Sequence, residues 1–384
     1  MSRFAIVTWD GGGNQPPAIG IGHELRKRGH EVRVLGYESQ RPRFERYGLE
    51  FTTLARSGGV DWQRTPPNER ISTMLRGAMA CPEHLDDVPE VLAAHPADLV
   101  LVDYLMIGAL AAVEKLRLPA VALVHSALAF MFEAASTPAG PVRLAAANEL
   151  RTRAGLSAVD SLPGTWSHLP AIVTTIPELD TSAAGAPSTT LYVGPIAEPS
   201  SETSWTSPWS ADDSRPIALV SFTTTTAWDQ TGRIRNTLEA LRESHLRVLV
   251  TAATPDVFEP LPANAAVRQF VPHPMVLPEA AVTITHAGHG TITASLAYGV
   301  PLVCLPNPMA DQPYLAQRVQ ELGAGIALAG DAPPYAIRRA VEEVVATDTY
   351  RDAAAHLAEA IRASSGASGA AAMLERQVAA ATER

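Results

Sequence analysis

The sequence has 384 residues, a hydrophobic content of 46% and a formal net charge of −10. Its composition excludes the disordered and fibrous classes of chain, and an acidic balance without a basic stripe argues against a nucleic-acid partner. The length is too great for one ordinary core, so we expect two domains of roughly 200 residues or fewer each.

The first half of the sequence alternates apolar, β-branched runs with helical patterns. Strands are predicted at residues 4–9, 31–35, 98–102, 120–124, 172–176 and 191–193. The first helix is expected to end at Gly29, and a helix rich in small residues is expected around residues 107–115. Continuous apolar strands with helices between them indicate a parallel sheet covered on both faces.

Three features bear on where the protein works. The most apolar region, residues 99–132, is interrupted by charged residues and by Pro119, so it cannot span a membrane. The sequence begins directly with a strand, which predicts that no signal peptide is present. Cys81 and Cys304 are far apart and lack metal-ligand spacing, so we expect free, buried thiols. Together these features predict a cytoplasmic protein.

The composition changes between Gly194 and Pro216, where Ser, Thr, Pro, Trp and Asp predominate. Such a stretch is typical of a linker and marks the best domain boundary in the sequence. We therefore predict an N-terminal domain at residues 1–205 and a C-terminal domain at residues 206–365.

The second half repeats the alternation of strands and helices. Strands are predicted at residues 217–222, 247–251, 267–271, 282–285 and 301–305. A helix is expected at residues 230–244, and another follows Asp311 and ends at Gly323. We therefore predict an α/β protein with two related parallel sheets, in which a ligand binds at the carboxyl ends of the strands in a cleft between the domains.

Residues 286–291 read His-Ala-Gly-His-Gly-Thr and join a predicted strand to a predicted helix. Gly288 and Gly290 allow the backbone to come close to a ligand, and the free N–H groups of the helix start point at it. Because a helix N-terminus carries about half a positive charge, a phosphate or diphosphate is its natural ligand. His286 and Thr291 would add side-chain donors to that ligand.

An acid–amide pair, Asp311 and Gln312, follows the next predicted strand. Donors at a helix start followed by this pair resemble the donor-binding motif of the family 1 glycosyltransferases of the bacterial natural-product type, and the resemblance extends over most of the chain. It implies the GT-B fold, in which two Rossmann-like domains face a central cleft. It also implies that the last helix, within residues 366–384, packs back on the first domain.

The resemblance assigns the diphosphate of a nucleotide sugar to the second domain. His286 would contact the first phosphate. The second phosphate would lie against four residues at the helix start, which are Gly288, His289, Gly290 and Thr291. A hydroxyl-rich loop that includes Ser221 and Thr223 could also reach the diphosphate, although a simple β-turn with capping threonines is the alternative.

The same resemblance places the sugar and the base. Asp311 and Gln312 would hydrogen-bond sugar hydroxyls, although Asp311 could also cap its helix. Phe270 and Val271 fall where the family binds the nucleobase of the donor. Ala294 stands where the family often has a glutamate that binds ribose hydroxyls. Because the loss of that bond, about 1.5–3 kcal/mol, matters less for a deoxyribose, we favour dTDP over UDP as the carrier.

The first domain is expected to bind the acceptor and to supply the catalytic base. Asn14 occupies the position of the family's catalytic histidine, and an amide cannot take up a proton at neutral pH. Asp103 matches the aspartate that orients that histidine. It could act as the base directly, through water or through Asn14, and strand-end capping is its alternative role. Asp10 and His125 also lie at predicted strand ends and could substitute.

The acceptor itself cannot be read from the sequence. In this fold, irregular segments such as residues 54–81 and 130–169 form the acceptor pocket, and their composition fits many apolar ligands. A phenol, or a carbon nucleophile beside one, would need the least help from a base, because phenols ionise near pH 10.

The sequence contains no Asp-X-Asp pair, and His273, His286 and His289 lack zinc spacing, so we expect no metal and no cofactor beyond the nucleotide-sugar co-substrate. We predict an inverting glycosyltransferase that moves a sugar, preferably a deoxysugar, from a dTDP or UDP carrier to a small lipophilic or aromatic acceptor. One alternative is a catalytically silent homologue that binds a nucleotide or assists a partner enzyme. Another is an enzyme, such as an epimerase, that acts on the nucleotide sugar itself.

Overall fold

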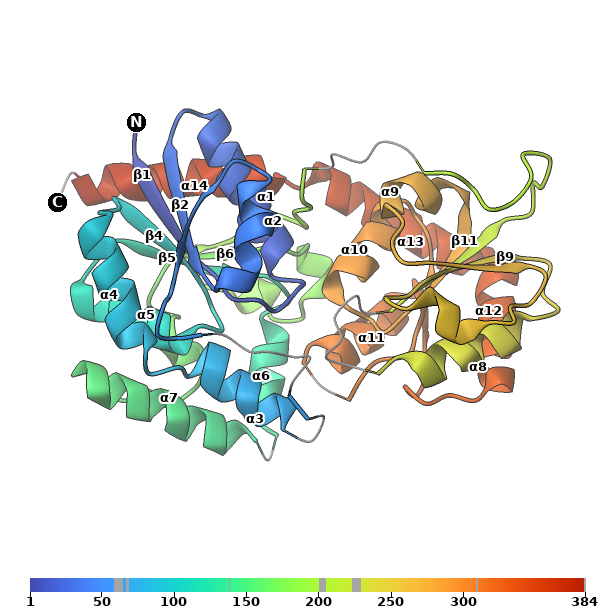
Figure 1. The fold of residues 1–384 in the computed structure, drawn as a ribbon, viewed down its shortest axis with the longest axis horizontal. Coiled ribbons are helices and arrows are strands. Elements are labelled where there is room, and N and C mark those ends of the chain that lie inside the picture. Colours follow the sequence, from blue (N-terminus) through green and yellow to red (C-terminus); the bar gives the residue numbers. More distant parts are fainter. Residues whose placement is uncertain are drawn as a thin grey trace. The chain divides into compact units, whose positions relative to one another are not determined.

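The computed structural model describes residues 1–58, 65–66, 69–137, 139–199, 205–222, 229–308 and 310–382. The chain forms two compact units, drawn as ribbons in Figure 1. Unit 1 comprises Met1–Pro199 and Ser364–Arg384, and unit 2 comprises Ser200–Ala363. These units divide after residues 199 and 363, whereas the sequence places the domain boundaries after residues 205 and 365.

In the described part of unit 1, seven parallel strands form one sheet in the order β3-β2-β1-β4-β5-β6-β7. The strands are β1 (Arg3–Val7), β2 (Glu31–Gly36), β3 (Glu50–Thr53), β4 (Leu99–Asp103), β5 (Ala120–Val124), β6 (Ala171–Val173) and β7 (Thr190–Tyr192). The helices of this part are α1 (Gln15–Lys27), α2 (Arg41–Glu45), α3 (Arg70–Met74), α4 (His84–Ala94), α5 (Ile107–Leu116), α6 (Ala129–Ala135) and α7 (Gly140–Ala154). Strands β4 and β5 are buried along their whole length, as the predicted two-sided covering of the sheet requires.

The helix α14 (Gly366–Thr382) completes unit 1 from the far end of the chain. Figure 1 shows α14 running alongside α1, and the two helices are in contact. Leu374 of α14 is fully buried in the same apolar cluster as Ile6 of β1 and Leu25 of α1. At the rim, Glu375 accepts a hydrogen bond of 2.9 Å from Arg28. Residues from both ends of the sequence therefore share one core.

In the described part of unit 2, six parallel strands form a second sheet in the order β10-β9-β8-β11-β12-β13. The strands are β8 (Ile217–Ser221), β9 (Arg247–Thr251), β10 (Ala265–Arg268), β11 (Ala280–Thr285), β12 (Leu302–Cys304) and β13 (Gly325–Ala327). The helices are α8 (Thr231–Leu241), α9 (His273–Val276), α10 (His289–Ala297), α11 (Gln312–Glu321), α12 (Pro334–Ala346) and α13 (Asp348–Ala363). Two parallel α/β sheets thus confirm the predicted fold class.

The strand predicted at residues 267–271 is wrong at both ends, because β10 is Ala265–Arg268. Phe270 and Val271 lie instead in the loop that leads to α9. Arg268 pairs with Thr251, the last residue of β9, so the ladder between the two strands ends there, and Pro272 then stands at the start of the next helix.

Each sheet has one point at which the strand order reverses. In unit 1 the chain passes from β1 to β2 and β3 on one side, and β4 then pairs with the other side of β1. In unit 2 the chain passes from β8 to β9 and β10, and β11 then pairs with the other side of β8. In open α/β sheets, ligands bind outside the carboxyl ends of the strands at such a point. These two positions are therefore where functional side chains are expected.

Candidate active site

In unit 2, the turn between β11 and α10 forms an open helix N-terminus. Ala287 has a φ of 65°, in the left-handed region, and Gly288 is the N-cap residue of α10. A Cβ on Gly288 would lie 2.5 Å from Nε2 of His286, so only glycine lets the imidazole lie against the turn. A Cβ on Gly290 would meet nothing within 4 Å. The space beside Gly290 is therefore open at the helix start, and helix N-termini are where anions commonly bind.

His286 lies beside this helix start and is buried, with 8% of its surface exposed. Burial, together with the positive charge of Arg233, lowers the pKa of His286 to about 4. The imidazole is therefore neutral near pH 7 and can donate one N–H to a phosphate without carrying a charge of its own. The positive potential at this point comes from the helix N-terminus and from Arg233 instead.

Ser221, at the end of β8, lies directly across the ladder from Thr285 of β11. Its hydroxyl lies 3.1 Å from Nε2 of His273 and accepts a hydrogen bond of 3.2 Å from Thr251, at the end of β9. Burial lowers the pKa of His273, which favours its neutral form, and the tautomer decides whether Nε2 accepts from or donates to Ser221. The network holds the Ser221 side chain at the point where the strand order reverses. Thr223 lies outside the described residues.

Asp311 and Gln312 begin α11, after β12. Asp311 is the N-cap residue, but in the described structure its carboxylate makes no capping hydrogen bond. Gln312 is 9% exposed, and its Oε1 accepts hydrogen bonds from the backbone N–H of Asn307, at 3.0 Å, and from Asn307 Nδ2, at 2.9 Å. Phe270 is 62% exposed, which leaves its ring available for stacking, whereas Val271 is buried. Both of these contacts of Gln312 use Oε1, and the ring of Phe270 is exposed.

In unit 1, one carboxylate oxygen joins side chains from three segments. Oδ2 of Asp103, at the end of β4, accepts a hydrogen bond of 3.1 Å from Nδ2 of Asn14 and lies 3.2 Å from Nδ1 of His125. Asp103 is fully buried, whereas the His125 side chain is 14% exposed. The His125 ring packs edge-on against Tyr104, with 5.1 Å between ring centres. A buried carboxylate beside a partly exposed imidazole is an arrangement suited to taking up a proton.

Asn14 is buried, and its amide is used within the protein. Nδ2 also donates to the carbonyl of Trp9 at 2.8 Å, and Oδ1 accepts from the backbone N–H of Gly11 at 3.1 Å. Asn14 therefore holds the turn after β1 against Asp103. Asp10 belongs to a different set of contacts, since its carboxylate accepts from Gln15 at 2.8 Å and from Ser39 at 2.7 Å.

Four residues with roles in these networks were not expected from the sequence. They are Thr251, Arg233, Asn307 and, as a partner of Ser221, His273. They come from different strands and helices and share no motif spacing. Only the order of the strands, which brings β8, β9, β11 and β12 together, could have grouped them.

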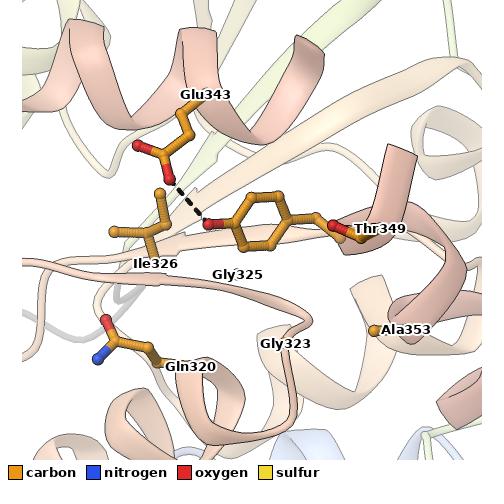
Figure 2. A pocket seen from close by; sticks show the side chains of 8 residues that line it. Gln320, Gly323, Gly325, Ile326, Glu343, Thr349 and Ala353 are labelled. Atoms are coloured by element: carbon orange, nitrogen blue, oxygen red, sulfur yellow. Dashed lines mark hydrogen bonds between the residues drawn. The ribbon is translucent and has the colours of Figure 1, made fainter. Parts of the chain in front are cut away.

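A separate cavity of about 450 Å³ lies in unit 2 at the amino end of β13. Figure 2 shows its lining, with Gln320 and Gly323 on one side and Glu343, which accepts a hydrogen bond of 3.0 Å from Tyr350, on the other. Because the candidate site lies at the carboxyl ends of the strands, this cavity is not part of it. Among the described residues, no cluster of three or more His, Cys, Asp or Glu side chains could hold a metal ion. No helix in the described ranges is long and apolar enough to cross a membrane.

Comparison with known proteins links both units to one group of enzymes. Residues 235–375 match the family described as erythromycin biosynthesis protein CIII-like, C-terminal domain, and residues 13–161 match the glycosyl transferase 4-like domain. The 4'-demethylrebeccamycin synthase of Lentzea aerocolonigenes is 25% identical over 402 residues, which cover 93% of this chain and 94% of that enzyme.

Solved structures extend the likeness to the whole fold. The glycotransferase of kitacinnamycin has a TM-score of 0.80 at 21% identity, covering 98% of this chain and 99% of its own. The glycosyltransferase VinC, solved in complex with dTDP, has a TM-score of 0.75 at 20% identity, covering 98% and 100%. These similarities confirm the GT-B fold that the sequence predicts.

Proposed function

Because the chain belongs to the family 1 glycosyltransferases of the GT-B fold, we propose that it transfers a sugar from a dTDP- or UDP-linked donor to a small lipophilic or aromatic acceptor, with inversion at the anomeric carbon. The observation that carries this proposal is the open N-terminus of α10 beside neutral, buried His286. Unit 2 would bind the nucleotide sugar there, and unit 1 would bind the acceptor.

The carrier we favour is dTDP. Ala294, on α10, packs against a buried apolar cluster and offers no carboxylate to ribose hydroxyls. A ribose would therefore miss a charge-assisted hydrogen bond, whereas a deoxyribose has one hydroxyl fewer to satisfy. VinC, a fold neighbour, is described in complex with dTDP, which supports the same preference. A deoxysugar is the matching choice for the transferred group.

We assign the role of general base to His125, with Asp103 as its orienting carboxylate. Asn14 cannot act as the base, because its amide takes up no proton and is already hydrogen-bonded on both atoms. Nδ1 of His125 lies 3.2 Å from Asp103 without a hydrogen bond in this structure, and in this proposal it turns to donate to that carboxylate while Nε2 accepts the acceptor's hydroxyl proton. The acceptor oxygen then bonds to the anomeric carbon as the bond from that carbon to the diphosphate breaks. This assignment makes the silent-homologue alternative unnecessary.

The nucleoside diphosphate leaves with the electrons of the broken bond and therefore gains negative charge. The first-turn amides of α10 and the N–H of His286 would stabilise that charge from fixed positions, as preorganised dipoles do in a site from which water is excluded. In this proposal no metal ion is needed to hold the diphosphate, and the nucleotide sugar is the only co-substrate.

Calorimetric titration with dTDP and with UDP tests the proposal on the wild type and on His286→Ala. We expect dTDP to bind the wild type more tightly than UDP and His286→Ala to weaken the binding about tenfold. His245→Ala changes an exposed histidine of unit 2 and is the matched control. If the wild type binds neither nucleotide, the proposed function is wrong and the similarity describes the fold alone.

A further inference from the structure

Three side chains of unit 2 form a chain of hydrogen bonds that ends at Gln312. Nη1 of Arg233, on α8, donates to Oδ1 of Asn307, in the loop after β12. Nδ2 of Asn307 donates to Oε1 of Gln312 at 2.9 Å, and the backbone N–H of Asn307 donates to the same oxygen at 3.0 Å. Asn307 and Gln312 are both buried, so little water competes for these bonds.

Groups that can only donate fix the orientation of both amides. A guanidinium has no acceptor atom, so the Asn307 atom that faces Arg233 must be the carbonyl oxygen. A backbone N–H also accepts nothing, so the Gln312 atom that faces Asn307 must be Oε1. Gln312 is therefore held with Nε2 on the side away from Asn307.

Arg233 is itself held firmly by uncharged groups. Nε donates to the carbonyl of Gly330 at 2.6 Å, Nη1 donates to Oε1 of Gln230 at 2.9 Å and Nη2 donates to the carbonyl of Pro306 at 3.2 Å. A planar guanidinium that makes bonds in several directions at once has one available orientation. It is therefore suited to holding another side chain in place.

We propose that Arg233 is a positioning residue for the donor sugar, because through Asn307 it holds Gln312 so that Nε2 donates a hydrogen bond to a sugar oxygen. The inference rests on the proposed function, in which Gln312 contacts the sugar of the bound nucleotide. It has a consequence for specificity. Gln312 favours a sugar with an acceptor oxygen opposite Nε2, and it adds no affinity for a sugar that is deoxygenated there.

Calorimetric titrations with dTDP and dTDP-glucose test the inference without an acceptor. The Kd for dTDP divided by the Kd for dTDP-glucose measures what the sugar adds to binding. We expect this ratio to fall about fivefold, the effect of one hydrogen bond, in Arg233→Met, in Asn307→Ser and in Gln312→Ala. The double variant Arg233→Met/Gln312→Ala should fall no further than Gln312→Ala, because both changes remove the same contact. Affinity for dTDP alone should stay within twofold of the wild type in Asn307→Ser and Gln312→Ala, which keep the charge of Arg233 near His286.

Two further variants distinguish a role of Arg233 in positioning Gln312 from a general disruption of unit 2. Arg233→Lys keeps a donor for Asn307 and should retain most of the wild-type ratio. Arg235→Met removes an exposed arginine from the same helix and should leave the ratio unchanged. Asn307→Ser keeps the test decisive if Arg233→Met does not fold.

Three results would overturn the inference. A tenfold loss of dTDP affinity in Arg233→Met would mean that the guanidinium acts on the diphosphate. Additive losses in the double variant would mean that Arg233 and Gln312 act separately. Equal affinities of the wild type for dTDP and dTDP-glucose would mean that Gln312 makes no useful sugar contact. Failure of the wild type to bind dTDP or UDP is a different result, because it removes the proposed function itself.

Discussion

Nδ1 of His125 lies 3.2 Å from Oδ2 of Asp103, at the carboxyl ends of the neighbouring strands β5 and β4. Asn14 donates to the same oxygen from the turn after β1. Nδ1 lies within ion-pair distance of the carboxylate, although it makes no hydrogen bond in this structure, and the His125 side chain is partly exposed. The chain therefore retains an acid–histidine pair, although the histidine comes from a different strand end than the sequence comparison with the family suggests.

The first prediction concerns this pair. His125→Gln should lower kcat at least about 100-fold, because removal of a general base typically costs that much or more. Affinity for dTDP should not change, since unit 2 binds the nucleotide. His95→Gln, which alters an exposed histidine of unit 1 outside the expected acceptor segments, is the control and should keep wild-type kcat. Steady-state kinetics with a dTDP-sugar and a phenolic acceptor measure both, and an unchanged kcat in His125→Gln would rule out the assignment.

Asn14 should matter for stability more than for chemistry. Asn14→Ala removes a buried donor from Asp103 and from the Thr8 hydroxyl, whereas the Gly11 N–H still donates to the carbonyl of Trp9. We expect a loss of about 2–3 kcal/mol in the free energy of unfolding of unit 1, the usual range for unpaired buried polar groups. Urea unfolding followed by tryptophan fluorescence measures it. Asn236→Ala, which removes one hydrogen bond to the carbonyl of Ala332, should cost less. Equal losses in the two variants would contradict the structural role.

The turn at the start of α10 can be tested with two glycines. Gly288→Ala should displace His286 and lower dTDP affinity about tenfold, because the new Cβ would lie 2.5 Å from Nε2. Gly290→Ala should leave the thermal midpoint unchanged, since its Cβ meets no protein atom, yet it should weaken dTDP binding if the ligand fills that space. Gly232→Ala, which also meets nothing within 4 Å, is the control for both. Wild-type affinity in Gly290→Ala would place the diphosphate elsewhere.

The pH dependence of stability follows from two buried histidines. Burial lowers the pKa of His286 and of His84 to about 4 in the folded protein, below the ordinary value of 6.5. As the pH falls below 6.5, the unfolded chain takes up these protons and the folded protein does not. Each histidine's contribution to the free energy of unfolding is therefore complete above about pH 6.5. As the pH falls towards 4 that contribution is lost, by up to about 3 kcal/mol for each histidine.

Urea unfolding at pH 7 and pH 5 measures this loss in the wild type and in His286→Gln. A glutamine does not titrate, so the variant should lose less stability between the two pH values. His356→Gln, which alters an exposed histidine of unit 2, should behave as the wild type does. The same slope in His286→Gln and the wild type would show that His286 is not protected from protonation.

Both sheets could be predicted from the sequence, because apolar runs such as those of β4 and β11 are buried on two sides and leave a clear pattern. Helix α7 could not. Its apolar residues do not gather on one face, and residues 130–169 were expected to be irregular, whereas Gly140–Ala154 is a helix. Arg151 of this helix is buried and forms an ion pair of 2.7 Å with Glu114 of α5. A polar contact therefore helps to attach α7 to its neighbour, where an apolar stripe is more usual.

The candidate site was predictable only where one short stretch of sequence contains it. The helix start from His286 to Thr291 is such a stretch, since a strand, two glycines and a helix follow each other directly. The contacts of Asn14 with Asp103, and of Arg233 with Asn307, join residues far apart in the sequence. They depend on which strands are neighbours, and no local pattern records that order.

The position of α14 has a consequence for how the protein is made. Ile6 and Leu25 precede unit 2 in the chain, whereas Leu374, which shares their core, follows unit 2 and is synthesised after it. The core of unit 1 therefore cannot be completed until all of unit 2 has been translated. Until then part of the apolar surface of unit 1 stays uncovered, while unit 2 is free to fold. During that interval the nascent chain is most in need of a chaperone, and a ribosome that stops before residue 366 leaves a product that cannot bury this surface.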